Sequence, residues 1–390
     1  MTSGILVDAC VIGGGPAALS SVLTLRRRGL SVALVRPIAK ARQFGRSECH
    51  LETLSADALE ALTQVGATAG FAKIGARPVT ARVSRWGGSQ AVETASIKKP
   101  GGIGWLIDKP AFVRMLDNLV DDGVTQMRGR VSLARRSSSG VLLRINNGGT
   151  GLVVSAAYAV DASGRSRAIA RALGASVTCT DTLVSAWVSW PAGNPSDQSV
   201  RLAAVNDGWA WSAVDSAGMR HVGYFTDGDL LARKRAGISD LVLRLAADGF
   251  VFDEADRPSA EMMGDEWSVR AAASTALDRA FGEQWVACGD AAQSVDPLSS
   301  SGSTTALWQG IAAGRAVANA LEGDTGALSG YGALVRRYYE GYLRVRAAFY
   351  RVGAVAHQEF WERRLDLTRC PTPAQGNAGR NGDRQGSVAG

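Results

Sequence analysis

The chain has 390 residues, of which 46% are hydrophobic and 20% charged, and it carries a net charge of +7. This length is too great for one hydrophobic core and predicts two or three domains. No apolar run approaches the roughly 20 residues of a membrane span, and no basic segment with interleaved aromatic residues is present, so we expect neither a membrane nor a nucleic acid as partner.

The amino terminus and the cysteine pattern favour a cytoplasmic protein. The first residues, MTSGILVDACVIGGG, lack the basic region that opens a signal peptide. The five Cys are scattered without a C-x-x-C pair and are expected to stay reduced, and the three isolated His give no metal-ligand spacing, so we expect no metal. The dispersed Arg residues are either solvated surface or an attraction for an anionic cofactor or acidic partner.

The first elements predict a β-turn-α-β unit. The apolar run 5–13 is typical of a buried strand, and the stretch ALSSVLTLRRRG that soon follows has apolar residues at helical spacing. A second apolar run, 31–36, completes the unit. The alternating segment 79–86 predicts a strand in another sheet.

The middle of the chain combines one helix with a β-rich stretch. Segment 105–123 predicts a helix whose first turn carries Pro110, and 152–164 predicts a strand pair that ends in a polar turn. Four further segments have the apolar and aromatic composition of strands, namely 182–190, 199–205, 208–214 and 220–227.

The last third predicts helices around one buried strand. That strand is expected at 285–290, after an amphipathic helix at 238–249. Two helices follow, near 304–321 and 329–356. Beyond them, 372–390 has almost no bulky apolar residue to offset its ordering entropy and predicts a disordered tail.

A glycine-rich turn separates the first strand from the first helix. It reads Gly13-Gly14-Gly15-Pro16-Ala17-Ala18 and fits the pattern G-x-G-x-x-A. In that pattern the first Gly permits a tight turn, the second lets the backbone approach a pyrophosphate, and the final Ala keeps helix and strand close. The helix amino terminus adds free N–H groups and a partial positive charge. The pattern predicts dinucleotide binding, with a merely structural turn as the alternative.

The residue at the end of the second strand does not indicate which dinucleotide binds. An Asp or Glu is expected there to bind ribose hydroxyls, but the residue is Arg36. An Arg can accommodate a 2′-phosphate or stack on adenine. The site alone therefore leaves FAD and NADP open.

A second loop, Gly289 to Leu307, decides between them. With VIGGGPAALS and YAVDASGRSR, it resembles the FAD-dependent aromatic hydroxylase superfamily, the group A flavoprotein monooxygenases. The resemblance implies that Asp290 binds the ribityl chain of FAD and that Asp296 and Pro297 lie beside the isoalloxazine. It also implies that Gly302 precedes a helix whose amino terminus faces the flavin. An ordinary serine-rich capping loop is the alternative.

The resemblance extends to other cofactor contacts and to the electron donor. Relatives place an Arg on FAD after the second strand, which points to Arg42 and Arg46, with plain surface charge as the alternative. Lys109 stands where relatives have an Arg, which puts a cofactor contact there in doubt. Only one dinucleotide fingerprint is present, as in this family, and the resemblance implies that NAD(P)H binds transiently as electron donor.

The fold that follows is α/β, with a Rossmann-like FAD-binding domain, an inserted β-sheet substrate domain and C-terminal helices. The FAD-binding domain is expected to be discontinuous, over 1–75, 101–180 and 265–325. The β-rich substrate domain would comprise 76–100 and 181–264. A C-terminal helical region, 326–371, and the tail would complete the chain.

Details of the sequence resemble the tryptophan-halogenase-like branch of the superfamily. Within that branch, the segments 51–66, 208–231 and 295–307 are most similar to flavoprotein monooxygenases of tryptophylquinone cofactor biogenesis, as in quinohemoprotein amine dehydrogenase maturation. The resemblance implies an aromatic substrate, a Trp side chain within a polypeptide. It implies hydroxylation by a flavin C4a-hydroperoxide formed from O2 after NAD(P)H reduces the FAD.

Two alternatives from other reaction classes stay open. Halogenases carry W-x-W-x-I-P and a reactive Lys, but here Trp209-Ala210-Trp211-Ser212 is followed by Ala213-Val214, and Arg77 and Pro78 stand where the Lys is expected. A flavin-dependent reductase or oxidase of a small molecule is the other enzymatic alternative, and a non-catalytic flavin-binding subunit is a third reading.

The hydroxylation that the resemblance implies requires a dry aromatic pocket more than a strong acid or base. Trp209, Trp211 and Tyr224 lie on predicted strands and are candidates to line it, with plain core residues as the alternative. Trp187 and Trp190 belong to the same group. The sequence identifies no general base.

Overall fold

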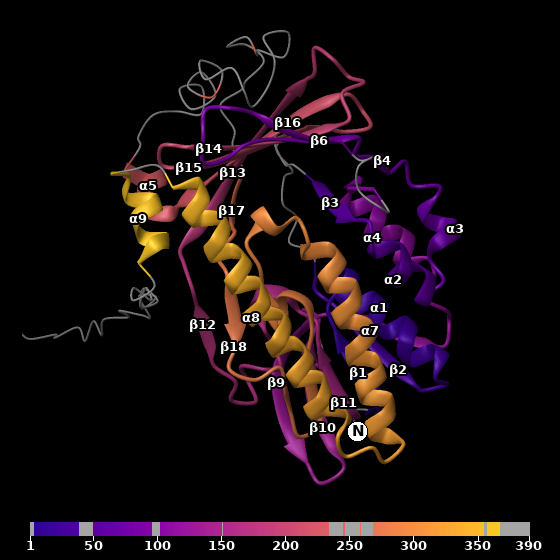
Figure 1. The fold of residues 1–390 in the computed structure, drawn as a ribbon. Helices are drawn as coiled ribbons and strands as arrows, with labels where there is room; N and C mark the ends of the chain where they lie inside the picture. Colours follow the sequence, from indigo (N-terminus) through magenta and orange to yellow (C-terminus); the bar gives the residue numbers. More distant parts are fainter. Residues whose placement is uncertain are drawn as a thin grey trace, which may run out of the picture.

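The computed structural model describes residues 4–38, 50–95, 102–149, 151–233, 245, 258, 268–354 and 357–366. The tail 372–390, Arg42, Arg46 and, apart from Leu245, the expected helix at 238–249 lie outside the described residues. The described part of the chain contains two large sheets, two small sheets and the long helices α7 and α8 (Figure 1).

The first large sheet has the order β19-β20-β11-β1-β2-β8, in which the strands from β20 to β8 are parallel and β19 is antiparallel to β20. Ala9, Cys10 and Val11 in the centre of β1 are fully buried, because strands lie on both sides of it and its faces are covered. The predicted β-turn-α-β unit is confirmed as β1, α1 and β2. The strands are β1 (Ile5–Ile12), β2 (Val32–Arg36), β8 (Val124–Arg128), β11 (Leu152–Asp161), β19 (Phe281–Gly282) and β20 (Trp285–Ala287).

The segment expected to form a strand pair is one continuous strand. β11 runs from Leu152 to Asp161 and pairs with β1 from Val154 to Asp161. Its first half also pairs with β10 (Gly140–Asn146), which continues to β9 (Arg130–Ser137). The prediction of two strands was wrong because the run has no Gly, Pro or Asn at which a chain could turn.

The second large sheet has the order β17-β13-β16-β15-β14-β5-β6. It confirms the strands expected in the β-rich stretch, and it places the segment near 81–85 in a different sheet from β1, as predicted. The strands are β5 (Ala81–Arg85), β6 (Val92–Ala95), β13 (Leu183–Pro191), β14 (Ser199–Val205), β15 (Gly208–Val214), β16 (Met219–Asp227) and β17 (Ser268–Ala271). Two three-stranded sheets join the larger ones, formed by β3 (Leu51–Ser55), β7 (Gly104–Asp108) and β4 (Arg77–Pro78), and by β12 (Val177–Cys179), β18 (Thr275–Leu277) and β21 (Gln293–Ser294).

The helix expected over 105–123 begins later and is shorter. Residues 104–108 form β7 and pair with β3, and α4 spans Lys109–Asp117 with Pro110 in its first turn, as predicted. The Asp108 carboxylate accepts a hydrogen bond from Ala111 N, so Asp108 caps the helix and fixes its start. The short apolar run before Asp108 is compatible with either structure, and pairing with β3 decides it.

Two helices pack closely because glycines lie where they cross. α1 (Pro16–Arg27) contacts α7 (Gly302–Leu321) at Gly310, where an added Cβ would lie 2.3 Å from the Ala17 carbonyl oxygen. At Gly314 a Cβ would lie 3.0 Å from the Ser21 carbonyl oxygen. Within the described residues, the further helices are α2 (Ala58–Gln64), α3 (Thr68–Phe71), α5 (Gly228–Arg233), α8 (Ala327–Gly353) and α9 (Glu359–Leu365).

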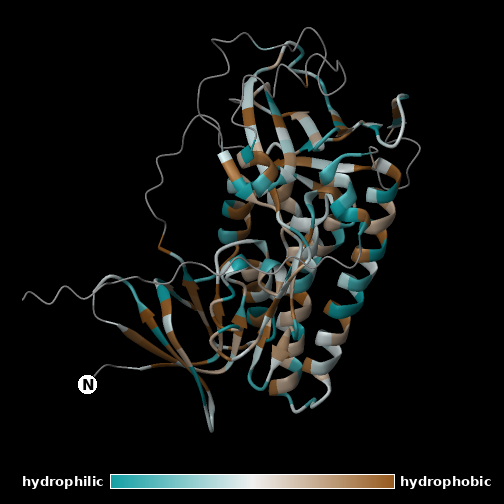
Figure 2. Cartoon of the chain, turned by 90° about the vertical axis from the view of Figure 1, so that its left-hand side faces the viewer, coloured by the Kyte–Doolittle hydropathy of each residue, from teal (hydrophilic) through white to brown (hydrophobic). Residues whose placement is uncertain are grey.

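The predicted fold class is confirmed. Hydrophobic residues concentrate in the strands of the parallel sheet, and α8 runs from this sheet toward the second one (Figures 1 and 2). Among the described residues, no helix combines the length and apolar character needed to cross a membrane.

Candidate functional site

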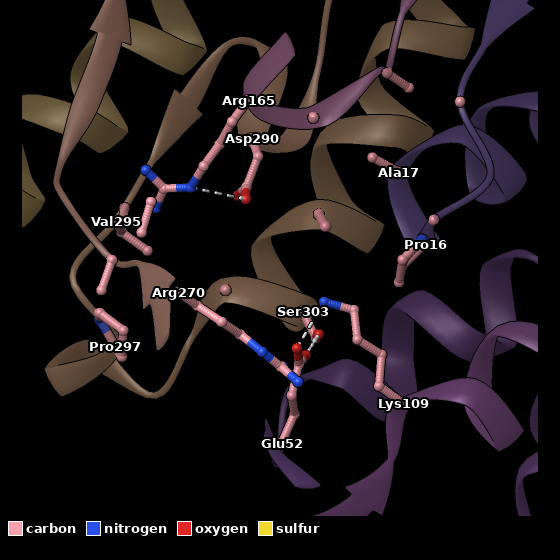
Figure 3. Close-up of a pocket in the computed structure, with 18 of the residues that line it drawn as sticks. Pro16, Ala17, Glu52, Lys109, Arg165, Arg270, Asp290, Val295, Pro297 and Ser303 are labelled. Atoms are coloured by element: carbon pink, nitrogen blue, oxygen red, sulfur yellow. Dashed lines mark hydrogen bonds and ion pairs between the residues drawn. The ribbon is translucent and has the colours of Figure 1, made fainter. Parts of the chain in front are cut away.

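A cavity of about 1040 Å³ lies between the two large sheets (Figure 3). Its walls come from the turn between β1 and α1, the turn after β11, the loop that leads into α7, and the near face of the second sheet. Within the described residues, no cluster of His, Cys, Asp and Glu is arranged to hold a metal ion. The walls of the cavity come from the start, the middle and the end of the chain.

The glycine-rich turn forms one end of the cavity. Gly13 has φ +146°, and a Cβ on it would lie 2.2 Å from the Ala162 carbonyl oxygen, so only glycine fits. Gly15, Pro16 and Ala17 line the cavity with Gly13, and an added Cβ on Gly15 would meet nothing within 4 Å. Ala18 is fully buried beneath them, which keeps α1 close to β1.

The amino terminus of α1 is open toward this space. Its cap residue is Gly15, no side chain caps it, and its first turn contains no acidic residue. Unpaired N–H groups and the helix dipole give such a terminus a partial positive charge. The turn is therefore suited to an anionic group such as a pyrophosphate.

Arg36 lies beside the turn and does not line the cavity. Its guanidinium forms an ion pair with Asp117 and donates to Gln126 Oε1 at 2.5 Å. Its aliphatic stem lies 3.8 Å from the position of a Cβ on Gly14. The Arg36 guanidinium is thus held by Asp117 and Gln126, and its stem lies beside the glycine-rich turn.

The loop from Gly289 that leads into α7 carries the other predicted cofactor residues, Asp290, Asp296, Pro297 and Gly302. Asp290 is half-exposed in the cavity, and its carboxylate lies 3.9 Å from the Arg165 guanidinium (Figure 3). Asp296 is fully buried, and Pro297 follows it in the cavity wall. Burial raises the pKa of the Asp296 carboxyl. Its side chain accepts a hydrogen bond from Leu298 N at 3.0 Å, which fixes the turn.

The loop ends at a second open helix terminus. α7 begins at Gly302, no side-chain hydrogen bond caps it, and its first turn has no acidic residue. Gly302 lines the cavity, and an added Cβ there would meet nothing within 4 Å. The amino termini of α1 and α7 therefore face one cavity, and both favour negative charge.

A polar cluster, of which the sequence analysis considered only Lys109, lies in the cavity wall. Lys109 lines the cavity, and its Nζ lies 2.6 Å from Glu52 Oε1, while Ser303 donates to the same carboxylate (Figure 3). The Glu52 charge raises the pKa of Lys109. No spacing in the sequence links these residues, because β3, α4 and α7 meet only in the folded chain.

An aromatic wall on the second sheet closes the other end of the cavity. It consists of Trp187, Trp209, Trp211 and Phe225. Trp209 stacks on Phe225 with ring centroids 3.6 Å apart and planes 4° apart, and Trp187 makes edge contacts with Trp211 and Phe225. Two of the three predicted pocket residues, Trp209 and Trp211, thus reach the cavity.

Tyr224 faces away from the cavity, contrary to the prediction. Successive side chains of a strand alternate between faces, so its neighbour Phe225 takes the cavity side. Tyr224 pairs in register with Ala210 rather than with Trp209, and its hydroxyl donates to the Asp207 carbonyl. Trp190 is likewise buried and does not line the cavity. Tyr224 is therefore not part of the pocket wall.

Comparison with known proteins identifies the family. Residues 6–338 match the family described as FAD binding domain. The chain belongs to this family. It is the family of the FAD-dependent aromatic hydroxylases and halogenases, as the sequence motifs predicted.

Similar proteins share the fold along almost the whole chain. LodB of Marinomonas mediterranea, described as an FAD-dependent oxidoreductase, is 26% identical over 364 residues, which cover 92% of this chain and 96% of LodB. The peptidyl tryptophan dihydroxylase QhpG is 25% identical, with a TM-score of 0.70 over 92% of this chain and 78% of QhpG. The myxobacterial chondrochloren halogenase CndH has a TM-score of 0.80 at 22% identity, over 92% of this chain and 86% of CndH.

The residues present fit FAD. The open space over Gly15 would admit its pyrophosphate at the α1 terminus, and Asp290 would accept hydrogen bonds from ribityl hydroxyls. The α7 terminus at Gly302 would favour negative charge on a reduced flavin. The family match and the two open termini together make this chain an FAD-binding protein of the oxidoreductase class.

Proposed function

We propose that this protein is an NAD(P)H- and O2-dependent FAD monooxygenase that hydroxylates the indole ring of a Trp residue in a polypeptide, during biogenesis of a quinone cofactor. The observation that carries the proposal is that the aromatic wall and the Asp296 turn line one cavity. Electron-rich indole substrates pack well against such rings. The likeness to the peptidyl tryptophan dihydroxylase QhpG supports the same class of substrate.

Each group of residues has a defined task in this proposal. Reduced FAD, when bound, supplies the oxygen chemistry. The α1 and α7 termini hold its anionic parts, and Asp290 and Arg165 border its middle. The wall of Trp187, Trp209, Trp211 and Phe225 orients the substrate ring and excludes water, as an oxygen-transfer site requires.

Halogenation is the second candidate, because CndH shares the fold. Among the described residues, the lysine that lines the cavity is Lys109, and Glu52 holds its ammonium group. Lys73, which is close in sequence to the position expected for the halogenase lysine, is exposed and is not part of the cavity wall. This pairing leaves no described lysine free at the aromatic wall, which favours hydroxylation.

The test uses the purified, FAD-loaded protein with Trp-containing polypeptides. NAD(P)H consumption and oxygen uptake are followed together, and the polypeptides are analysed by mass spectrometry with and without halide. Incorporation of oxygen into a Trp, independent of halide, is the expected result. Halide-dependent incorporation of chlorine or bromine would establish halogenation instead. NAD(P)H oxidation that needs no oxygen would indicate a reductase and refute both.

A further inference from the structure

A buried hydrogen-bonded chain joins the aromatic wall to the Asp296 turn. Trp209 Nε1 donates to the Tyr350 hydroxyl at 3.1 Å, and that hydroxyl donates to Asp296 Oδ2 at 2.6 Å. An indole N–H can only donate, so the direction of the chain is fixed. Trp209 and Asp296 line the cavity, whereas Tyr350 is fully buried behind them. Tyr350 thus connects two walls of the cavity without touching its interior.

Tyr350 belongs to a polar stripe on α8, which we define as Tyr342, Arg346 and Tyr350. Residues four apart lie on one face of a helix. Asp296 N donates to the Tyr342 hydroxyl at 2.8 Å, and Arg346 Nε lies 3.5 Å from Asp296 Oδ2. Arg346 also forms an ion pair with Asp181 at 2.7 Å. The stripe therefore holds the Asp296 turn by both its backbone and its side chain.

The same stripe fixes the aromatic wall. Stacking of Trp209 on Phe225 fixes the tilt of the indole, and the bond from its N–H to Tyr350 fixes the indole within its own plane. The Arg346 guanidinium lies 4.7 Å from the centroid of the Tyr350 ring and holds the ring in place. Because α8 runs from the parallel sheet to the second sheet (Figure 1), it links the two walls as one rigid element.

We propose that Tyr350 is a positioning residue that sets the distance between the Asp296 turn and the aromatic wall. It would thereby set the separation of a bound flavin from its aromatic substrate. The family match ends at residue 338, so Tyr350 lies beyond the matched residues. The expected effect on turnover rests on the proposed function, whereas the effect on Trp209 does not.

The first measurement is structural and needs no substrate. In FAD-loaded protein labelled with 15N-tryptophan, the Trp209 indole N–H is assigned with a Trp209→Phe variant. In Tyr350→Phe, which removes only the hydroxyl, that resonance should shift and exchange with solvent about fivefold faster, as expected for one lost hydrogen bond. Tyr342→Phe should leave the Trp209 resonance unchanged and, in uniformly 15N-labelled protein, speed exchange of the Asp296 amide. An unmoved Trp209 resonance in Tyr350→Phe would overturn the proposal.

The second measurement separates positioning from general stability. Tyr331→Phe is the matched control, since it also removes a buried hydroxyl from α8. The Tyr331 hydroxyl donates to the Ala287 carbonyl oxygen at 2.6 Å, and Tyr331 does not line the cavity. Tyr350→Phe should lower kcat about tenfold with FAD affinity unchanged within about twofold, because misplacement slows the chemistry rather than binding. An equal kcat loss in Tyr331→Phe would refute positioning. Absence of oxygenation in the wild type would refute only the proposed function.

Discussion

At the scale of single residues, burial controls the chemistry of the cysteines. Cys10 in β1 and Cys288 after β20 are fully buried, and burial raises the pKa of both thiols, that of Cys10 to about 12. Cys179 is only half-buried. Since the thiolate is the reactive form, the two core thiols are inert near neutral pH although Cys10 lies in the strand before the Gly13–Ala17 turn and Cys288 lines the cavity.

This difference predicts selective labelling of the native protein. At pH 8, a thiol of pKa 12 is ionised in only about one molecule in ten thousand, so iodoacetamide should leave Cys10 and Cys288 unmodified while it labels Cys179. The raised pKa values mean that reactivity should appear only as the pH rises well above 9. Peptide mass spectrometry measures the labelling, and full modification of all three in denaturant is the control. Equal native rates for Cys10 and Cys179 would contradict the buried arrangement.

At the scale of elements, the crossing of α1 and α7 places two helix termini at one cavity. The crossing depends on Gly310, where a Cβ would lie 2.1 Å from Ser20 Oγ and 2.3 Å from the Ala17 carbonyl oxygen. Ser20 Oγ also donates to the Leu307 carbonyl across the crossing. A side chain at Gly310 must therefore push the helices apart.

Gly310→Ala should accordingly weaken both the fold and FAD binding. We expect a loss of about 1–3 kcal/mol in the free energy of unfolding, typical of overpacking, together with weaker FAD binding as the termini separate. Gly330→Ala on α8 is the matched control, because nothing lies within 4 Å of its Cβ, and it should gain up to about 1 kcal/mol from helix propensity. Urea unfolding and FAD titration measure the effects. A Gly310→Ala variant as stable as wild type would refute the close crossing.

At the scale of the whole molecule, one ligand would join segments that are far apart in the sequence. The cavity is bordered by the turn at Gly13–Ala17, the Asp290 loop and the second sheet, so FAD would join the Gly13–Ala17 turn to the distant Asp290 loop. A ligand that binds only the folded state stabilises it in proportion to the logarithm of its concentration. The stability of the molecule should thus depend on its cofactor.

Adding FAD to the apoprotein should therefore raise the midpoint of thermal unfolding. At a hundredfold excess over Kd the gain is about 2.7 kcal/mol. Asp290→Ala should reduce this gain by weakening FAD binding about tenfold, since hydrogen bonds to a charged group contribute about 1.5–3 kcal/mol. Asp122→Ala, which removes an exposed charge, is the control. Differential scanning fluorimetry over a series of FAD concentrations measures the midpoint of thermal unfolding. An Asp290→Ala variant that shows the full gain would refute the role assigned to Asp290.

The sequence alone determined the local units of this protein. The β-turn-α-β unit, the Gly13–Ala18 turn and the loop into α7 could be predicted because their patterns depend on neighbouring residues. β7 was missed because the short apolar run before Asp108 fits a helix or a strand, and only pairing with β3 distinguishes them.

Tertiary structure decided which side chains share the cavity. β16 is buried on both faces, so hydrophobicity could not tell that Phe225 faces the cavity and Tyr224 does not. Lys109, Glu52 and Ser303 come from three separate elements, and Tyr350 reaches Asp296 from 54 positions away. Such contacts depend on how sheets and helices pack, and no spacing along the chain records them.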